Sequence, residues 1–325
     1  MWLNAFAQTN DAYTLGVEGI KEVDAGNYNE GIKLLKQARN LAPQEYDYTI
    51  EIGKAYFLSG NPKMAEKFLY PLQYHENVQP DLYLVLANCY KELEELKKNP
   101  NPERKKELDA LRYGIQKFPE TGILYLELGK RKIEMETPIE ALATFESGIM
   151  NAPNFADNYF WAAKLMKATG NNLWAWIYAE TFFNLSESEE MKRTAALLIN
   201  DATEVIFSEN WNADPEKMDQ DLRFMLASKC KNSEVGWNKI LNKRACLMKE
   251  WRETDYAISV IIDRMYELES KGFLESYLAT IYLESDKERF LPWLADEHAK
   301  GFDAYRKWRY WNPVSFNKPL KRLNQ

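Results

Sequence analysis

The chain has 325 residues and a formal net charge of −7, which indicates an acidic globular protein of two domains or one extended repeat array. Its 46% apolar content excludes intrinsic disorder, and the scarcity of glycine (14) and proline (13) disfavours an all-β fold. Because phosphate binding needs a broad basic surface, the acidic charge also argues against a general grip on nucleic acid.

The N-terminus contains a short sequence typical of a secretory cleavage site. Ala-Phe-Ala at residues 5–7 precedes Gln8, although the usual long apolar region is absent. We interpret residues 1–11 as an N-terminal extension with the remnant of a signal peptide, so that the mature protein begins near Gln8. This interpretation predicts a periplasmic or secreted protein; without signal processing we expect a cytoplasmic one.

A small residue recurs at a nearly constant interval after this segment. The series is Gly19, Gly53, Ala87, Gly129 and Ala163, with intervals of 34, 34, 42 and 34 residues. A second series of small residues and a series of prolines have the same spacing and the same interruption of eight residues: Gly31, Ala65, Ala141 and Ala175, and Pro43, Pro119 and Pro153. This periodicity predicts five helical hairpins in residues 12–187.

The pattern resembles the tetratricopeptide-repeat (TPR) family, in which an aromatic-x2-Leu-Gly-x2-Tyr helix precedes an Ala-x3-Phe helix closed by proline. The fourth repeat has Tyr125, Leu128, Gly129, Ala141, Phe145 and Pro153 at these positions. Two residues depart from it, because Gly31 stands where alanine is usual and Glu107 replaces a small residue. The resemblance implies an all-α fold with a right-handed TPR superhelix, whose first helices line a concave groove.

The eight extra residues belong to the third repeat, near residues 97–104. The sequence Lys-Lys-Asn-Pro-Asn-Pro-Glu at residues 97–103 is polar and interrupted by two prolines. This composition favours a lengthened turn between the two helices of that repeat.

Two rows of side chains on the first helices are expected to line the groove. An apolar row lies three positions before each small residue and a polar row lies one position after it: Ile50, Leu84, Leu126 and Phe160, and Lys54, Asn88, Lys130 and Lys164. Residues four apart share a helix face, so these rows, together with Phe57, form the predicted peptide-binding groove. The first repeat extends it with Gly16 and Ile20.

This groove suits a protein or peptide partner with apolar anchors and acidic groups. The alternative interpretation is that the lysines form only a solvated face and that the chain's own C-terminal region covers the apolar row.

Residues 188–325 continue with helical periodicity but without the repeat pattern or a family resemblance. Helices are expected at residues 189–208, 215–230, 235–252, 255–270, 273–284 and 286–311. We expect this helical C-terminal region to cap the apolar end of the repeat array.

The C-terminal tail is basic and aromatic. Residues 300–325 carry seven positive charges and one negative charge, and the candidate second binding site consists of Tyr305, Arg306, Trp308, Arg309 and Trp311. This combination suits nucleic acid, glycan, a membrane interface or an internal acidic surface. The helical spacing of the three aromatic residues favours docking against the protein's own core.

No catalytic, cofactor or metal-binding motif is evident in the sequence. His75 and His298 have no metal-ligand spacing, glycine-rich phosphate loops are absent, and no segment approaches the ~20 apolar residues of a membrane span. Cys89, Cys230 and Cys246 form no CxxC pair, so we expect buried small side chains rather than a zinc site or disulfides.

These observations predict a non-catalytic protein–protein interaction scaffold or adaptor, located in the bacterial cell envelope if the signal remnant is real. The alternative is an enzyme or small-ligand-binding protein with its site in the C-terminal helices. A third hypothesis is a structural oligomer assembled groove to tail; the sequence leaves the oligomeric state open.

Overall fold

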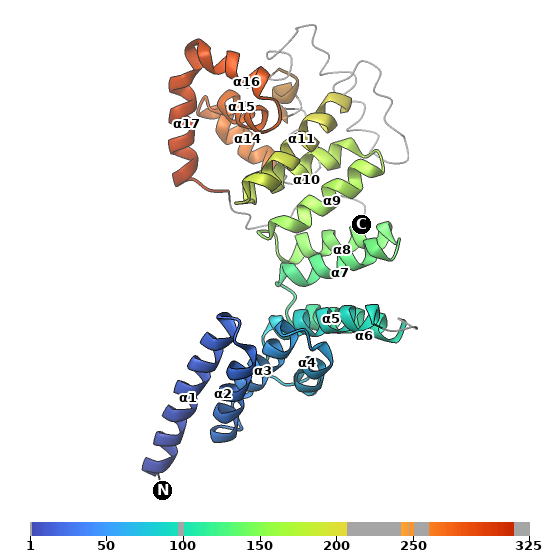
Figure 1. Cartoon of the computed structure of the whole chain (residues 1–325). Helices are drawn as coiled ribbons and strands as arrows, with labels where there is room; N and C mark the ends of the chain where they lie inside the picture. The colour runs from blue at the N-terminus through green and yellow to red at the C-terminus, as the bar shows by residue number, and fades with distance from the viewer. Residues whose placement is uncertain (1, 97–100, 207–241, 247, 250–259, 315–325) are drawn as a thin grey trace. The chain divides into compact units, whose positions relative to one another are not determined.

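The computed structural model describes residues 2–96, 101–206, 242–246, 248–249 and 260–314. Every regular element in these segments is a helix, and none is a strand (Figure 1). The chain divides into two compact units, residues 1–128 (unit 1) and 129–325 (unit 2), and each is described by itself. None of the described helices is both long enough and apolar enough to cross a bilayer.

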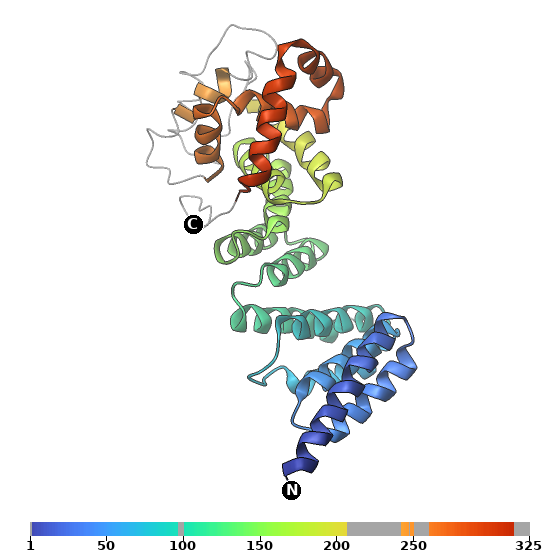
Figure 2. The same cartoon turned by 90° about the vertical axis from the view of Figure 1, so that its left-hand side faces the viewer.

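Unit 1 consists of helical hairpins, which Figure 2 shows from a second side. Its helices are α1 (Trp2–Asp24), α2 (Tyr28–Leu41), α3 (Tyr46–Leu58), α4 (Pro62–Leu69) with the 3-10 turn η1 (Tyr70–Leu72), α5 (Pro80–Glu95), α6 (Asn101–Lys117) and the first half of α7 (Gly122–Glu134). The pairs α1–α2, α3–α4 and α5–α6 pack against each other, as the TPR pattern predicts. Residues 2–11, expected as an extension, belong to α1.

The recurring small residues mark the points where paired helices approach closely. A Cβ atom added to Gly31 of α2 would lie only 2.8 Å from the carbonyl oxygen of Gly19 in α1. Similarly, Gly53 of α3 contacts the side chain of Leu69 in α4. The close backbone approach explains why the first repeat has glycine where the TPR pattern has alanine.

In two repeats, the tyrosine of the repeat pattern donates a hydrogen bond to the carbonyl of the preceding proline of the pattern. The Tyr125 hydroxyl donates to the Pro119 carbonyl over 3.0 Å, and the Tyr159 hydroxyl donates to the Pro153 carbonyl over 2.9 Å. Each bond joins a first helix to the turn before it. The spacing found in the sequence therefore reflects a repeated contact as well as a repeated shape.

The extra residues of the third repeat lengthen its helices. Residues 97–100 lie outside the described residues, but residues 101–103, expected in a turn, begin α6. Helices α5 and α6 have 16 and 17 residues, whereas α3 has 13. The prolines did not prevent this extension because Pro102 lies in the first turn of α6, where its missing N–H has no helical partner to lose.

Unit 2 contains the remaining repeats and the C-terminal helices. After the second half of α7 these are α8 (Pro138–Asn151), α9 (Ala156–Ala168), α10 (Asn172–Leu185), α11 (Glu189–Ile206), α14 (Val260–Ser270), α15 (Leu274–Ser285), α16 (Lys287–Trp293), the π-helical turn η2 (Leu294–His298) and α17 (Ala299–Trp311). The expected helices at 189–208 and 273–284 correspond to α11 and α15, and α14 covers the described part of 255–270. The helix expected at 215–230 and most of that at 235–252 lie outside the described residues.

The single helix expected at 286–311 is interrupted. Pro292 lies inside α16, and the π-helical turn η2 separates α16 from α17. Proline lacks the N–H that would continue the helical ladder, and its ring displaces the preceding turn. The expectation of one continuous helix was therefore wrong at this proline.

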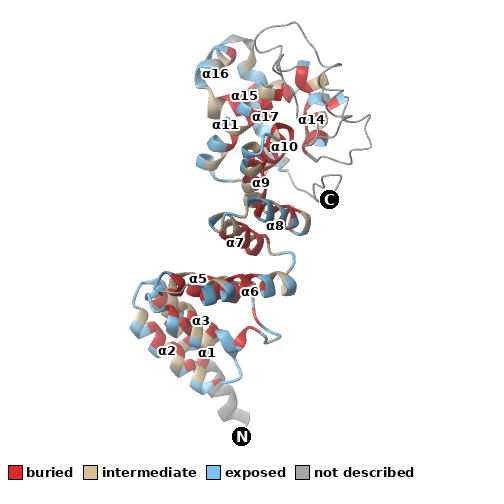
Figure 3. Ribbon diagram, turned by 90° about the vertical axis from the view of Figure 1, so that its right-hand side faces the viewer, coloured by how far each residue is buried: buried red, intermediate tan, exposed pale blue. Residues whose placement is uncertain are grey.

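Helix α10 is the most enclosed helix of the fifth repeat. Eleven of its 14 residues are buried, including Trp176, Phe182 and Phe183 (Figure 3). It packs against α9, α11 and α14. A helix that is buried on all sides requires cover on all sides, and here α9, α11 and α14 supply it.

Candidate protein-binding surface

The apolar row of the predicted groove is largely covered. Ile50, Leu126 and Phe160 are 4%, 2% and 7% exposed, and only Leu84 is half-buried. The Phe160 ring packs against Phe182 of α10, with ring centroids 5.0 Å apart. Side chains covered to this extent offer little area to a peptide.

Lys54 of the polar row is held by two carboxylates. Its ammonium lies 2.8 Å from Glu51 Oε1 in the same helix and also contacts Asp81 at the start of α5, in the next repeat. Partial burial lowers the pKa of Lys54, but the hydrogen bonds to Asp81 and Glu51 outweigh it and raise the pKa overall. Lys54 therefore links two repeats as a charged ammonium group.

Lys130 has an equivalent carboxylate in unit 2. Burial raises the pKa of Asp157 in α9, while the positive charge of Lys130 acts in the opposite direction. Asp81 and Asp157 occupy the same repeat position, six residues before Ala87 and Ala163. We call each such pair a Lys–Asp rung, because it spans the first helices of consecutive repeats.

The remaining groove residues are more accessible. The Lys164 side chain is exposed, with its ammonium 4.6 Å from the Trp161 ring centroid, a cation–π contact. Asn88 is exposed and Phe57 is half-buried. Thus two of the three lysines expected to attract an acidic partner already interact with the protein's own carboxylates.

One face of α1 carries an exposed apolar stripe, of which the predicted groove included only Ile20. Tyr13, Val17 and Ile20 are 66%, 48% and 37% exposed and lie at i, i+4 and i+7 on one helix face. We call these three residues the α1 stripe. Gly16 on the same face contacts the Tyr48 ring of α3. The sequence did carry a signal for the whole stripe. Tyr13, Val17 and Ile20 are apolar residues at helical spacing that lie outside the buried face of α1.

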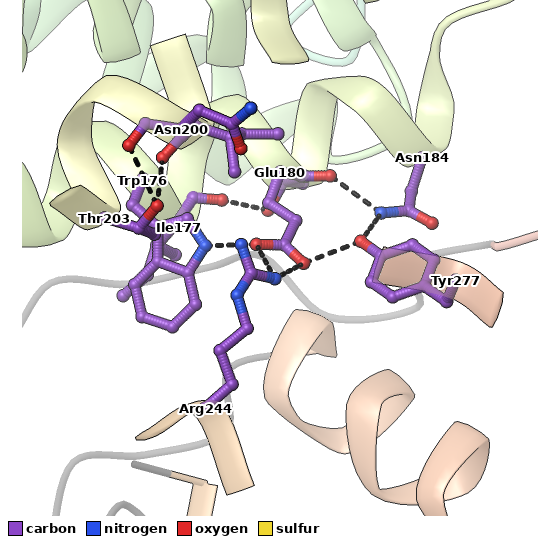
Figure 4. Close-up of polar contacts among 10 residues, drawn as sticks. Trp176, Ile177, Glu180, Asn184, Asn200, Thr203, Arg244 and Tyr277 are labelled. Atoms are coloured by element: carbon purple, nitrogen blue, oxygen red, sulfur yellow. Dashed lines mark hydrogen bonds and ion pairs between the residues drawn. The ribbon is translucent and has the colours of Figure 1, made fainter. Parts of the chain in front are cut away.

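A second concentration of functional groups lies between α10 and the C-terminal region (Figure 4). Glu180 of α10 accepts hydrogen bonds from Arg244 at 2.9 Å, from the Tyr277 hydroxyl at 2.7 Å, and from the Trp176 indole. Asn184 donates to the Tyr277 hydroxyl over 2.8 Å. We call these five residues the Glu180 network.

The Glu180 network has the composition of a catalytic site but not its accessibility. The side chains of Arg244 and Glu180 are 3% and 0% exposed. Burial, with the adjacent negative charge and hydrogen bond of Glu180, raises the pKa of Tyr277 well above its ordinary value and keeps the phenol protonated. Because the ion pair at its centre is closed to solvent and joins α10 to the C-terminal region, the network acts as a structural connection.

The basic aromatic segment is divided between core and surface. Tyr305 is 2% exposed, and the half-buried Trp308 lies under the Arg264 guanidinium at 4.3 Å. The Arg309 guanidinium lies 5.9 Å from the Phe183 ring centroid. Arg306 and Trp311 are exposed. Docking against the core thus accounts for Tyr305 and Trp308 but leaves Trp311 in solvent.

The expectation that the chain has no disulfide was wrong. Cys89 is a buried free thiol, as expected, and burial raises its pKa to about 12. Cys246, however, is disulfide-bonded, although the sequence spacing had indicated no disulfide. Sequence spacing reveals disulfides poorly because their cysteines meet through the fold. Within the described residues, no group of three or more potential ligands could hold a metal ion.

Comparison with known proteins shows similarity at the level of fold. No protein-family model and no curated protein matches the chain. Solved structures that resemble it include PilF of Pseudomonas aeruginosa (14% identity, 81% of this chain, 99% of that chain, TM-score 0.48). Another is TTC0263, a thermophilic TPR protein of Thermus thermophilus (14% identity, 58% and 99% coverage, TM-score 0.44).

The structure of MamA is similar over a comparable length (19% identity, 55% of this chain, 94% of that chain, TM-score 0.43). At these identities the likeness concerns the fold alone. The hairpins, the close helix crossings and the tyrosine–proline bonds make residues 12–187 a TPR-like segment.

Proposed function

We propose that the protein is a non-catalytic interaction scaffold that binds a segment of another protein on the inner surface of unit 1. The α1 stripe is the observation that carries this proposal. Three apolar side chains in register on the first helix remain accessible to a partner, in contrast to the covered apolar row. An amphipathic helix or an extended peptide can place apolar side chains against such a stripe.

Charge has a secondary role in this proposal. An acidic group of the partner can bind Lys54 only by displacing Asp81 or by joining an ammonium that already has two carboxylates. We therefore propose that burial of the α1 stripe supplies most of the affinity, with exposed Asn88 adding hydrogen bonds to polar groups.

The binding surface can be tested by site-specific crosslinking. A photoreactive amino acid at position 17 is expected to crosslink a defined protein in the cells that make this chain, which mass spectrometry identifies. With that protein in hand, Val17→Glu is expected to weaken binding at least about tenfold, because an apolar contact is replaced by a charge. Ile139→Glu is the matched control, since Ile139 in α8 is 83% exposed outside the α1 stripe. Equal affinity for the Val17→Glu variant and the wild type would contradict the proposal.

We propose a periplasmic or secreted location for the protein. The small-x-small sequence before Gln8 supports this location, and so does the disulfide at Cys246, because disulfides persist mainly in oxidising compartments. Protein from its own cells is expected to begin near Gln8 and to resist alkylation at Cys246 until it is reduced. A cytosolic protein with Met1 retained and a freely alkylated Cys246 would contradict this location.

The alternative of an enzyme or small-ligand site in the C-terminal helices gains no support from the Glu180 network. Its two charged side chains, Arg244 and Glu180, pair with each other and are almost fully closed to solvent. A binding site for substrate requires convergent polar groups in an accessible pocket.

A further inference from the structure

Helix α17 has one face fixed to the core of unit 2. Phe302 and Tyr305 are 7% and 2% exposed, and the Tyr305 ring lies 6.3 Å from the Tyr277 ring between centroids. The C-terminal end of the helix is held as well, because Arg264 donates to the Asn312 carbonyl over 2.5 Å. Figure 1 shows α17 along the left-hand edge of unit 2, and in Figure 2 the same helix faces the viewer. The helix is therefore a rigid support for the groups on its other face.

The opposite face of α17 is basic and ends in two aromatic rings. Lys300, Lys307 and Trp311 are exposed and lie at i, i+7 and i+11, which places them on one helical face. The same face carries one acidic side chain, the exposed Asp303, between the two lysines. Tyr310 and Trp311 are 76% and 78% exposed, and their rings meet edge to face with centroids 4.9 Å apart. Arg306 adds another exposed base. Large aromatic rings that are this exposed, beside several basic side chains, are typical of a surface that binds another molecule.

The net positive charge of this segment favours an anionic partner. Residues 300–325 have a net charge of +6, whereas the remainder of the chain has −13. This segment thus has a net positive charge although the protein as a whole is acidic.

The aromatic pair favours a lipid surface among anionic partners. Tryptophan and tyrosine prefer the headgroup region of a bilayer, where the ring is in an apolar layer and the N–H or O–H reaches water. Lysine and arginine side chains near the membrane surface are attracted to anionic headgroups. Single-stranded nucleic acid needs open ring faces in series for stacking, whereas the edge of one ring here points at the face of the other.

We propose that the exposed face of α17 (Lys300, Arg306, Lys307, Tyr310 and Trp311) is a peripheral membrane contact that binds anionic phospholipid headgroups. It attaches unit 2 to a bilayer surface and leaves the α1 stripe in unit 1 to a protein partner. The contact needs no membrane-spanning segment. The basic side chains supply long-range attraction, and the rings of Tyr310 and Trp311 insert into the headgroup region.

Cosedimentation of the full chain with vesicles tests this contact. The protein is expected to bind vesicles of phosphatidylcholine with phosphatidylglycerol at least about tenfold more tightly than vesicles of phosphatidylcholine alone, and added salt is expected to weaken binding. The variant Tyr310→Ser/Trp311→Ser and the variant Lys300→Glu/Lys307→Glu are each expected to lose about tenfold or more in affinity. All four side chains are exposed, so both variants are expected to retain the wild-type thermal midpoint.

A matched control comes from another aromatic pair. Tyr74 is 65% exposed and meets Tyr113 edge to face at 5.6 Å in unit 1, so Tyr74→Ser removes an exposed ring outside α17 and is expected to leave vesicle binding unchanged. Equal binding to both vesicle types, or unchanged binding by both α17 variants, would overturn the proposal. Preference for an oligonucleotide over anionic vesicles would also overturn it. Val17→Glu is expected to retain vesicle binding, which separates this contact from the protein-binding surface.

Discussion

Two ion pairs, one in unit 1 and one in unit 2, lie in opposite surroundings. In unit 1, Lys54 and Asp81 join neighbouring repeats through side chains that are 25% and 44% exposed. In unit 2, Arg244 and Glu180 join the C-terminal region to the fifth repeat through side chains that are 3% and 0% exposed. Opposite charges are in contact in both pairs, but water solvates only the first.

The difference in solvation separates two kinds of connection. An exposed pair gains little over the hydrated ions and can exchange one partner for another. A buried pair has lost its hydration, so removal of one member leaves an uncompensated charge. The Lys–Asp rung is therefore a replaceable link on a surface, whereas the Glu180 network is a connection that must remain intact.

Removal of Arg244 is expected to have the largest effect. Arg244→Met leaves Glu180 buried without its counter-charge, so the free energy of unfolding is expected to fall by about 3–5 kcal/mol. Denaturant unfolding at neutral pH measures this change. Arg244→Met combined with Glu180→Leu is expected to recover most of the loss, because no charge remains buried. A loss below about 1 kcal/mol for the single variant would show that water reaches the pair.

The hydroxyl of Tyr277 gives the same network a pH dependence. Tyr277→Phe removes a hydrogen bond to Glu180, so a loss of about 1–3 kcal/mol is expected at neutral pH. The unfolded chain releases the tyrosine proton at pH ~10, whereas burial raises the pKa of folded Tyr277 well above that value. The contribution of this group is thus present below pH ~10 and is lost as the pH rises further.

Denaturant unfolding across this pH range measures the difference between wild type and Tyr277→Phe. The variant has no hydroxyl to titrate, so the difference is expected to narrow above pH ~10. A difference that widens there would contradict the burial of Tyr277 as a neutral phenol.

The sequence predicted the parts of the fold that depend on regular spacing. The interval of 34 residues located the crossing at Gly53 and the recurring positions of the prolines, whereas the bonds from Tyr125 and Tyr159 to the prolines were found in the structure. Each of these contacts occurs within one hairpin or between a helix and the turn before it. Local contacts of this kind recur with the repeat, so periodicity reveals them.

Exposure and long-range pairing could not be predicted in the same way. Helical spacing placed Ile50 and Phe160 on one face but did not show what covers them. Similarly, Lys54 was identified, but its pairing with Asp81 depends on the distance between two helices. Arg244 and Glu180 are 64 residues apart and follow no repeat, so no sequence pattern connected them.

The close helix crossing at Gly31 is expected to contribute to the stability of unit 1. Alanine favours helix over glycine, but its Cβ would lie 2.8 Å from the Gly19 carbonyl oxygen. Gly31→Ala is therefore expected to lower the free energy of unfolding by about 1–3 kcal/mol through overpacking. Gly301→Ala in α17 is the control, because its Cβ has 3.9 Å to the nearest heavy atom and is expected to be neutral or slightly stabilising. Equal stability of the Gly31→Ala variant and the wild type would show that α1 and α2 separate easily.

The Lys–Asp rung is expected to show the smallest effect. A double-mutant cycle of Lys54→Met and Asp81→Asn measures the coupling between the two side chains, expected to be about 0.2–1 kcal/mol because both remain partly hydrated. Lys33 and Glu30 are the reference pair, with side chains 62% and 50% exposed, and should couple still more weakly. A coupling as large as the loss from Arg244→Met would mean that the inner surface excludes water around Lys54. In that case the rung would hold the repeats together, and an acidic partner could not take the place of Asp81.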